Sequence, residues 1–272
     1  MFVSKAISTF LVLSLFTIIH SAYGVEVVLF EEDFDSLELG PTINEQVAQD
    51  AVWTNTPPDG WTIESDLAAP GMPEWDGWAF ADGEWWTQTA EDQERSKFTR
   101  NDGKAIQTIA IADPDEWDDL GSPGDQGTFN SWLSTPPISI LGVAADTLVL
   151  TFDSSWRPED TQNAEVTVSF DGEAGIVLVR MESSGTDTIY REPHNNVEET
   201  KPDLEQVNET IEINVPNPAG AETAVFTWAM IDATNDWWWA IDNISVKTTA
   251  EVAAVSSSGK LSTAWGDIKA NR

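Results

Sequence analysis

The feature that most constrains the fold is a repeated change between short β-branched or aromatic stretches and clusters of turn-forming residues. The stretches are VEVVLFEEDF, AIQTIAIAD, DTLVLTFDSSW, AEVTVSFDG, GIVLVRMES, ETIEINV, ETAVFTWAMID and WWWAIDNISV. Between them lie Gly, Pro, Asn and Asp clusters such as NTPPDGW and LGSPGDQGT, and only EWWTQTAEDQERSKF suggests a helix. Eight or more strands joined by turns predict an all-β sandwich or barrel with few short helices.

The first 24 residues have the pattern of a secretory signal peptide. Lys5 supplies a positive charge, AISTFLVLSLFTII is an apolar run, and Ala22 and Gly24 are small residues suited to a cleavage site. The alternative is an uncleaved anchor, but the run is short for a membrane span. We therefore expect a secreted or cell-surface protein without a membrane span after cleavage.

Charge and cysteine content exclude several classes of function. The chain has 272 residues with no cysteine, and 13 basic against 47 acidic residues give a net charge of −34. Thiol catalysis and cysteine-based zinc sites are excluded, and an exported chain without cysteine fits a bacterial source. So acidic a surface repels nucleic acid. The acids serve either solubility or the binding of a divalent cation such as Ca²⁺.

The chain divides into three parts. After the signal peptide, residues 25–247 read as one domain, which we expect to be monomeric. Residues 248–272 begin with TTAEVAAVSSSGK, a linker composition, and end in LSTAWGDIKANR, a short Trp-Gly tail. This tail is either a disordered terminus or a sorting or docking tag.

Little in the sequence points to catalysis. His194 is the single histidine after the signal segment, and no Gly-x-Ser-x-Gly pattern supplies a nucleophile for it. The closest acid pair of the kind that glycosidases use lies in EEDFD, without a further catalytic pattern. We therefore expect a protein that is not an enzyme.

Two strands at the ends of the domain each carry a carboxylate on an apolar face. Under the period-two rule Glu32 shares a face with Phe30 and Phe34, and Asp242 shares a face with Ile244. A buried charge must be paired or bound to metal, and first and last strands are commonly neighbours in jelly rolls. This pattern predicts a structural Ca²⁺. The alternative is that the acids cap backbone amides. The predicted ligands are Glu32, Asp33, Asp35 and Asp242.

The last strand contains a conflict of parity. Trp239 and Ile241 fall on the opposite face from Asp242. Either both faces of this strand are covered, or a β-bulge near Asp242 and Asn243 changes the register. The bulge is the preferred interpretation, because an acid in the middle of a strand often marks such a site.

The chain has 14 tryptophans, which either stack on sugar rings or fill the core. Those in strand contexts, Trp132, Trp156 and Trp228, are expected in the core. The loop EWDGWAFADGEWW is the better candidate for a surface patch. The predicted ligand-binding residues are Trp75, Trp78, Trp85, Trp86 and Trp237.

Several segments together resemble the choice-of-anchor J and cleaved-adhesin group of domains. They are PPDGWTIESD, GWAF, NSWLSTPPISI, LVLTFDSSW, AEVTVSFDG and WWWAIDNISV. The group is similar to MAM domains, whose opening and closing signatures look like DFD and AIDNI here. The resemblance implies a jelly-roll β-sandwich of two antiparallel sheets on an exported bacterial protein, often adhesive, and in the wider class often carrying Ca²⁺.

The sequence as a whole predicts an exported, non-catalytic binding or adhesion module, stabilised by calcium and directed to an extracellular glycan or a surface protein. Two alternatives stay open: a carbohydrate-active enzyme that uses paired carboxylates, and a structural component of a surface layer or matrix.

Overall fold

The computed structural model describes residues 26–40, 43–44, 47–48, 51–88, 93–96, 98, 107–120, 127–202 and 207–248. The predicted signal peptide and the predicted linker and tail lie outside these residues, apart from Thr248, which ends the last strand. Within the described segments, no helix is both long and apolar enough to span a bilayer.

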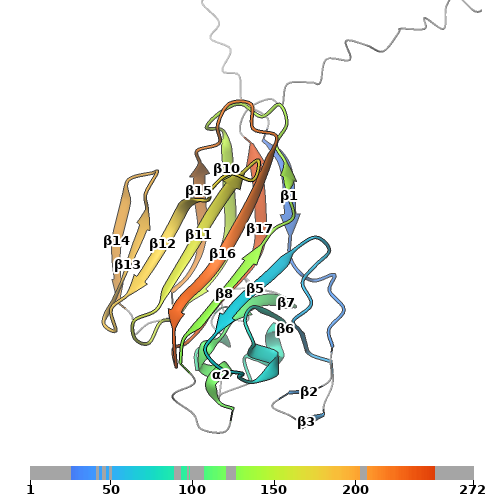
Figure 1. Ribbon diagram of the computed structural model, residues 1–272, viewed down its shortest axis with the longest axis vertical. Coiled ribbons are helices and arrows are strands. Elements are labelled where there is room, and N and C mark those ends of the chain that lie inside the picture. The colour runs from blue at the N-terminus through green and yellow to red at the C-terminus, as the bar shows by residue number, and fades with distance from the viewer. Residues whose placement is uncertain are drawn as a thin grey trace, which may run out of the picture.

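Two antiparallel sheets pack face to face (Figure 1). The larger sheet has the order β14-β13-β12-β11-β16-β8-β5, and β9 pairs with β16 at its margin. Its strands are β5 (Thr62–Leu67), β8 (Phe129–Ser134), β9 (Ile138–Ser139), β11 (Asn163–Phe170), β12 (Ile176–Ser183), β13 (Asp187–Glu192), β14 (Val197–Pro202) and β16 (Thr223–Ala233).

The smaller sheet has the order β15-β10-β17-β7-β6-β4, and β1 also pairs with β17. Its strands are β1 (Val27–Glu32), β4 (Trp53–Thr54), β6 (Ala79–Asp82), β7 (Thr108–Ala112), β10 (Leu148–Trp156), β15 (Val207–Val215) and β17 (Trp239–Thr248). A separate short pair joins β2 (Ile43–Asn44) and β3 (Val47–Ala48). The predicted jelly-roll sandwich of two antiparallel sheets is confirmed.

Three short helical turns lie at one end of the sandwich: η1 (Pro73–Trp75), α1 (Gly83–Trp86) and α2 (Pro114–Asp118). The Asp82 carboxylate caps α1 by accepting from the Trp85 amide at 2.8 Å. The loops of η1 and α2 meet, because Trp117 Nε1 donates to Asp76 Oδ1 at 3.1 Å. Of the helix suggested for residues 84–98, the structure describes the turn α1, which ends at Trp86, and helical backbone at Ser96 and Phe98. Residues 89–92 and 97 lie outside the described residues.

The core forms where the inner faces of the two sheets meet. Burial alternates residue by residue along β11, as the period-two rule requires for a strand with one covered face. Trp228 on β16 lies near the middle of this core, stacked on Trp61 with centroids 6.1 Å apart and edge-on to Phe152. Aromatic pairs of this kind add to the stabilisation that burial provides.

The first and last strands are neighbours, as predicted. Glu32 on β1 lies opposite Ile244 on β17. Along β10 the pairing with β17 shifts between Thr151 and Asp153, and Asn243 adopts a φ of 52°. The predicted bulge is therefore confirmed. Asp242 is buried, but it lies opposite Asp153, which faces outward between Phe152 and Ser154 on β10, so the prediction that Asp242 shares a face with Ile244 is wrong.

Candidate functional site

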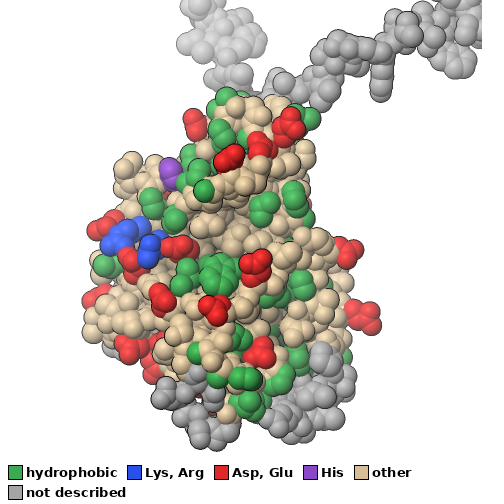
Figure 2. Space-filling view, viewed as in Figure 1, with side chains coloured by type: hydrophobic (Ala, Val, Ile, Leu, Met, Phe, Trp, Pro, Cys, Tyr) green, Lys and Arg blue, Asp and Glu red, His purple; other side chains and the backbone are tan. Residues whose placement is uncertain are grey.

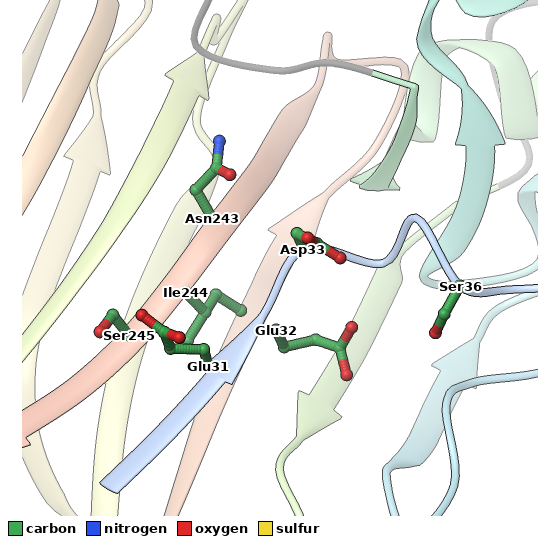
Figure 3. A pocket seen from close by; sticks show the side chains of 7 residues that line it. All are labelled: Glu31, Glu32, Asp33, Ser36, Asn243, Ile244 and Ser245. Carbon is green, nitrogen blue, oxygen red and sulfur yellow. The ribbon is translucent and has the colours of Figure 1, made fainter. Parts of the chain in front are cut away.

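A cavity of about 490 Å³ opens where the end of β1 meets the bulge of β17 (Figure 3). Glu31 points towards Ser245, whereas Glu32 points to the other side of β1. The cavity is lined by Glu31, Glu32, Asp33, Ser36, Asn243, Ile244 and Ser245. Two of the four predicted calcium ligands, Glu32 and Asp33, lie in this lining.

The predicted ligands on the β1 side hold backbone amides. Glu32 Oε1 accepts from the Phe34 amide at 2.8 Å, and Asp33 Oδ1 accepts from the Asp35 amide at 3.2 Å. Burial raises the pKa of Glu32, although the Phe34 hydrogen bond acts against this shift. These acids therefore act as caps of the turn after β1.

The other two predicted ligands are also hydrogen-bonded. Asp35 accepts from the Thr108 amide at 3.0 Å and from Gln107 Nε2 at 2.7 Å. Asp242 Oδ1 accepts from the Asn243 amide at 2.7 Å. Within the described ranges, no group of three or more His, Cys, Asp or Glu residues is placed to hold a metal ion. The calcium site stays a prediction.

The loop tryptophans lie mainly inside the molecule. Trp75, Trp78 and Trp86 are fully buried, so their assignment to a surface patch is wrong. Trp75 stacks on the half-buried Trp85 at 5.7 Å, and Trp78 packs against Trp239 at 5.6 Å. Their loops fold back over the end of the sandwich, because only the core can cover so much aromatic surface.

A buried ion-pair network holds this end together. Arg95 is fully buried and pairs with Asp113 at 3.0 Å and with Glu116 at 2.7 Å. Trp86 Nε1 donates to Asp113 Oδ2 at 3.1 Å, and the Arg95 guanidinium lies against the rings of Trp86 and Trp238. These contacts give the region a structural role.

Two carboxyls of α2 in this network have raised pKa values. Burial, aided by the charge of Asp113, raises the pKa of Asp115 to about 7. The same causes raise the pKa of Glu116 to about 8, against the opposing charge of Arg95. Glu116 is buried, so it lies out of reach of a substrate.

Trp237 is half-buried, and one face of its indole is covered. The ring stacks on Trp238 at 5.7 Å with an interplanar angle of 15°. The guanidinium of Arg157 lies over the Trp237 ring. Arg157 also lies 5.2 Å from the centroid of Trp238, so it covers the same side of Trp237 as Trp238 does, and the three side chains pack together at this end of the sandwich.

Trp132 lies on the outer face of the larger sheet and not in the core, where its strand context predicted it. Along β8, Phe129, Ser131 and Leu133 are buried, whereas Asn130, Trp132 and Ser134 are half-buried on the outer face of the larger sheet. The expectation of a core position is therefore wrong for Trp132. It is confirmed for Trp156 and Trp228. The signal was available, because the period-two rule groups Trp132 with two polar neighbours.

Five outward residues on five adjacent strands form what we call the Trp132 row. Each lies directly opposite the next in the strand register, so all five share one face. Trp132 is thus flanked by an exposed carboxylate on one side and by a small residue on the other. The row consists of Glu64, Trp132, Ala229, Glu165 and Arg180.

Polar groups surround Trp132 on this face. Thr62 and Asp66 are exposed on β5, and Ser134 hydrogen-bonds to Thr227 at 2.7 Å on the far side. In the part of the chain that the structure describes, the Trp132 ring pairs with no other aromatic ring and its Nε1–H donates no hydrogen bond. Figure 2 shows this face, with hydrophobic side chains near its middle and acidic side chains around them. An accessible indole among acceptors and hydroxyls can stack on a sugar ring and bond its hydroxyl groups.

No model of a known protein family matches the sequence, and no curated protein matches it. Solved structures with a similar fold include the K3 cleaved adhesin domain of Lys-gingipain from Porphyromonas gingivalis w83. It is 14% identical, with a TM-score of 0.41, over 81% of this chain and 98% of that one.

Two further structures illustrate the range of proteins with a similar fold. The carbohydrate-binding module TmCBM61, solved with β-1,4-galactotriose, is 15% identical with a TM-score of 0.36, over 69% of this chain and 88% of that one. A Stig cyclase from Fischerella sp. TAU is 11% identical with a TM-score of 0.43, over 82% and 98%. Likenesses at this level concern the fold alone, so the function is argued from the site itself.

Proposed function

We propose that the protein is a non-catalytic, glycan-binding adhesion module that binds its ligand on the outer face of the larger sheet. The observation that carries this proposal is the outward, half-buried Trp132, set between the carboxylate of Glu64 and the small Ala229. An indole fixed on a rigid strand offers a sugar a flat apolar surface at low cost in conformational entropy.

The surroundings of Trp132 supply the hydrogen-bonding groups that a sugar needs. Glu64 and Asp66 can accept from sugar hydroxyls, and the Trp132 Nε1–H can donate to one. A few polar groups placed around an apolar surface are the usual composition of a small-ligand site. The proposal also includes export, which rests on the signal pattern of residues 1–24.

A carbohydrate-active enzyme is less well supported. The carboxyls with the largest rise in pKa, Asp115 and Glu116, belong to the network around Arg95. Asp115 also accepts from Gln93 and Asn235, both at 3.4 Å. These acids stabilise the fold and do not flank an accessible cleft as a general acid and base would.

A glycan array tests the proposal. The wild-type protein should bind a defined subset of immobilised glycans without releasing cleaved products. Trp132→Ala should lose about 5- to 150-fold in affinity, because stacking on one aromatic ring is worth about 1–3 kcal/mol by analogy with base stacking. Trp132→Phe, which keeps a ring, should retain part of the binding.

Trp85→Phe is the matched control, because Trp85 is a half-buried tryptophan at the other candidate patch. It should leave binding unchanged. Equal binding by wild type and Trp132→Ala, or a loss of binding in Trp85→Phe alone, would contradict the assignment of the face.

A further inference from the structure

The Trp132 row ends at a surface ion pair between Glu165 and Arg180, which lies on the same face of the sheet as the Trp132 indole. Adjacent strands lie about 4.8 Å apart, so the three steps from β8 to β12 place the Arg180 backbone about 14 Å from that of Trp132. Ala229, which lies between them in the register, has a side chain of one methyl group and is 3% exposed. The path from Trp132 to the ion pair therefore has no long side chain standing across it on β16.

We infer that the ligand is an uncharged glycan chain that lies across the strands, from Trp132 over Ala229 to the Glu165–Arg180 ion pair. The inference rests on the proposed function and adds the class of glycan, its direction on the sheet and a second contact.

The ion pair has the chemistry to bind sugar hydroxyls. Arg180 Nη1 lies 3.2 Å from Glu165 Oε1, and the two side chains are 44% and 17% exposed. Such a pair leaves guanidinium N–H groups and carboxylate lone pairs unused. A donor and an acceptor side by side match two neighbouring hydroxyls, each of which can donate and accept.

The alternative direction, along β8, offers polar groups that are already engaged. Asn130 Oδ1 accepts from the Asp232 amide at 2.8 Å, and its Nδ2 donates to the Asp66 carbonyl at 3.4 Å. The Ser134 hydroxyl is bonded to Thr227. A chain that continues across the sheet therefore gains more new hydrogen bonds than one that follows the strand.

The charge on this face favours an uncharged ligand. Arg180 is paired with Glu165 and Glu182, and Arg191 is paired with Glu182 and Glu198. In Figure 2 the basic side chains accordingly lie among acidic ones. With Glu64 and Asp66 also exposed nearby, a glycan that carries carboxylates meets net repulsion.

Calorimetric titration with oligosaccharides of increasing length tests the inference. The probes are β-1,4-linked gluco-, manno- and galacto-oligosaccharides from two to six units, with α-1,4-linked oligogalacturonates of the same lengths as acidic probes and their methyl esters as the neutral counterparts. Affinity for the preferred neutral series should rise until the chain spans about 14 Å and then level off. The oligogalacturonates should bind more weakly than their neutral counterparts at low salt.

Variants locate the second contact. Arg180→Ala should lower the affinity for a tetrasaccharide by about tenfold and leave that for a disaccharide unchanged, since a hydrogen bond to a charged group is worth about 1.5–3 kcal/mol. Asn130→Ala, the control on the path along β8, should change neither affinity by more than about twofold. Melting temperatures near that of the wild type would show that the variants are folded.

The outcomes separate the inference from the function on which it rests. An equal effect of Arg180→Ala on short and long chains, a larger loss in Asn130→Ala, or tighter binding of oligogalacturonate would overturn the inference while glycan binding through Trp132 stands. If no glycan binds the wild type, or if Trp132→Ala binds as well as the wild type, the proposed function itself fails.

Discussion

Two tryptophan-containing regions of this molecule have opposite roles. At the end of the sandwich, Trp75, Trp78 and Trp86 are buried against other rings. On the outer face of the larger sheet, Trp132 stands among polar side chains. A cluster of aromatic residues in a sequence therefore indicates the core more often than a ligand site, because burying large apolar surfaces stabilises the fold.

Replacing one tryptophan in each region with alanine should give the largest difference in stability between the two regions. Trp86→Ala should lower the free energy of unfolding by about 3–5 kcal/mol, since it leaves a cavity and removes a hydrogen bond to the buried Asp113. Trp132→Ala should lower it by less than about 1 kcal/mol. Urea denaturation measures both. Equal losses in the two variants would remove the distinction between the regions.

A change of pH should affect the stability of the buried end of the sandwich but not the binding of glycan at Trp132. In the folded state the pKa values of Asp115 and Glu116 are raised to about 7 and about 8, so between about pH 4 and pH 8 the folded state holds more protons than the unfolded state. The free energy of unfolding should therefore fall as pH rises through this window.

Asp115→Asn should flatten this dependence, and Glu198→Gln, a change at an exposed site on β14, should leave it unaltered. Glycan affinity should vary little over the same pH range, because these buried acids lie outside the Trp132 row. Urea denaturation at several pH values measures the slope. Stability that rises with pH across the window would contradict the assigned burial.

The smallest expected effect concerns the cavity at β1 and β17. If Glu32 and Asp242 only cap backbone amides, a chelator should change the melting temperature by less than about 2 °C. A fall of several degrees that added Ca²⁺ reverses would instead support the calcium prediction. Asp242→Ala would then be the variant in which that response disappears.

The strands, and the pairing of the first strand with the last, could be predicted from the local sequence pattern. The spacing of the apolar residues predicted the bulge at Asn243, because Trp239 and Val246 both face the core although an odd number of positions separates them. Parity placed Asp242 on the wrong face, since the bulge sets it opposite the outward Asp153. The pairing of β1 with β17 followed from the jelly-roll topology that the pattern suggested.

The candidate site could be predicted only in part. The outward position of Trp132 can be predicted from its polar neighbours Asn130 and Ser134, whereas a tryptophan within a strand by itself predicts burial. Its row could not be predicted, because Glu64, Ala229 and Glu165 come from strands distant in sequence whose register depends on the whole sandwich. The burial of the loop around Trp75 likewise depends on long-range packing, which local periodicity does not report.

The central claim, that Trp132 and not the loop tryptophans contacts the ligand, is tested most directly by indole nuclear magnetic resonance. Protein labelled with ¹⁵N at tryptophan would be titrated with the glycan that binds best on the array, and the Trp132 indole signal would be assigned by its loss in Trp132→Phe. The account predicts that the Trp132 signal shifts most, with the signals of Trp85 and Trp237 almost unchanged. A shift of Trp85 or Trp237 while Trp132 stays in place would contradict it.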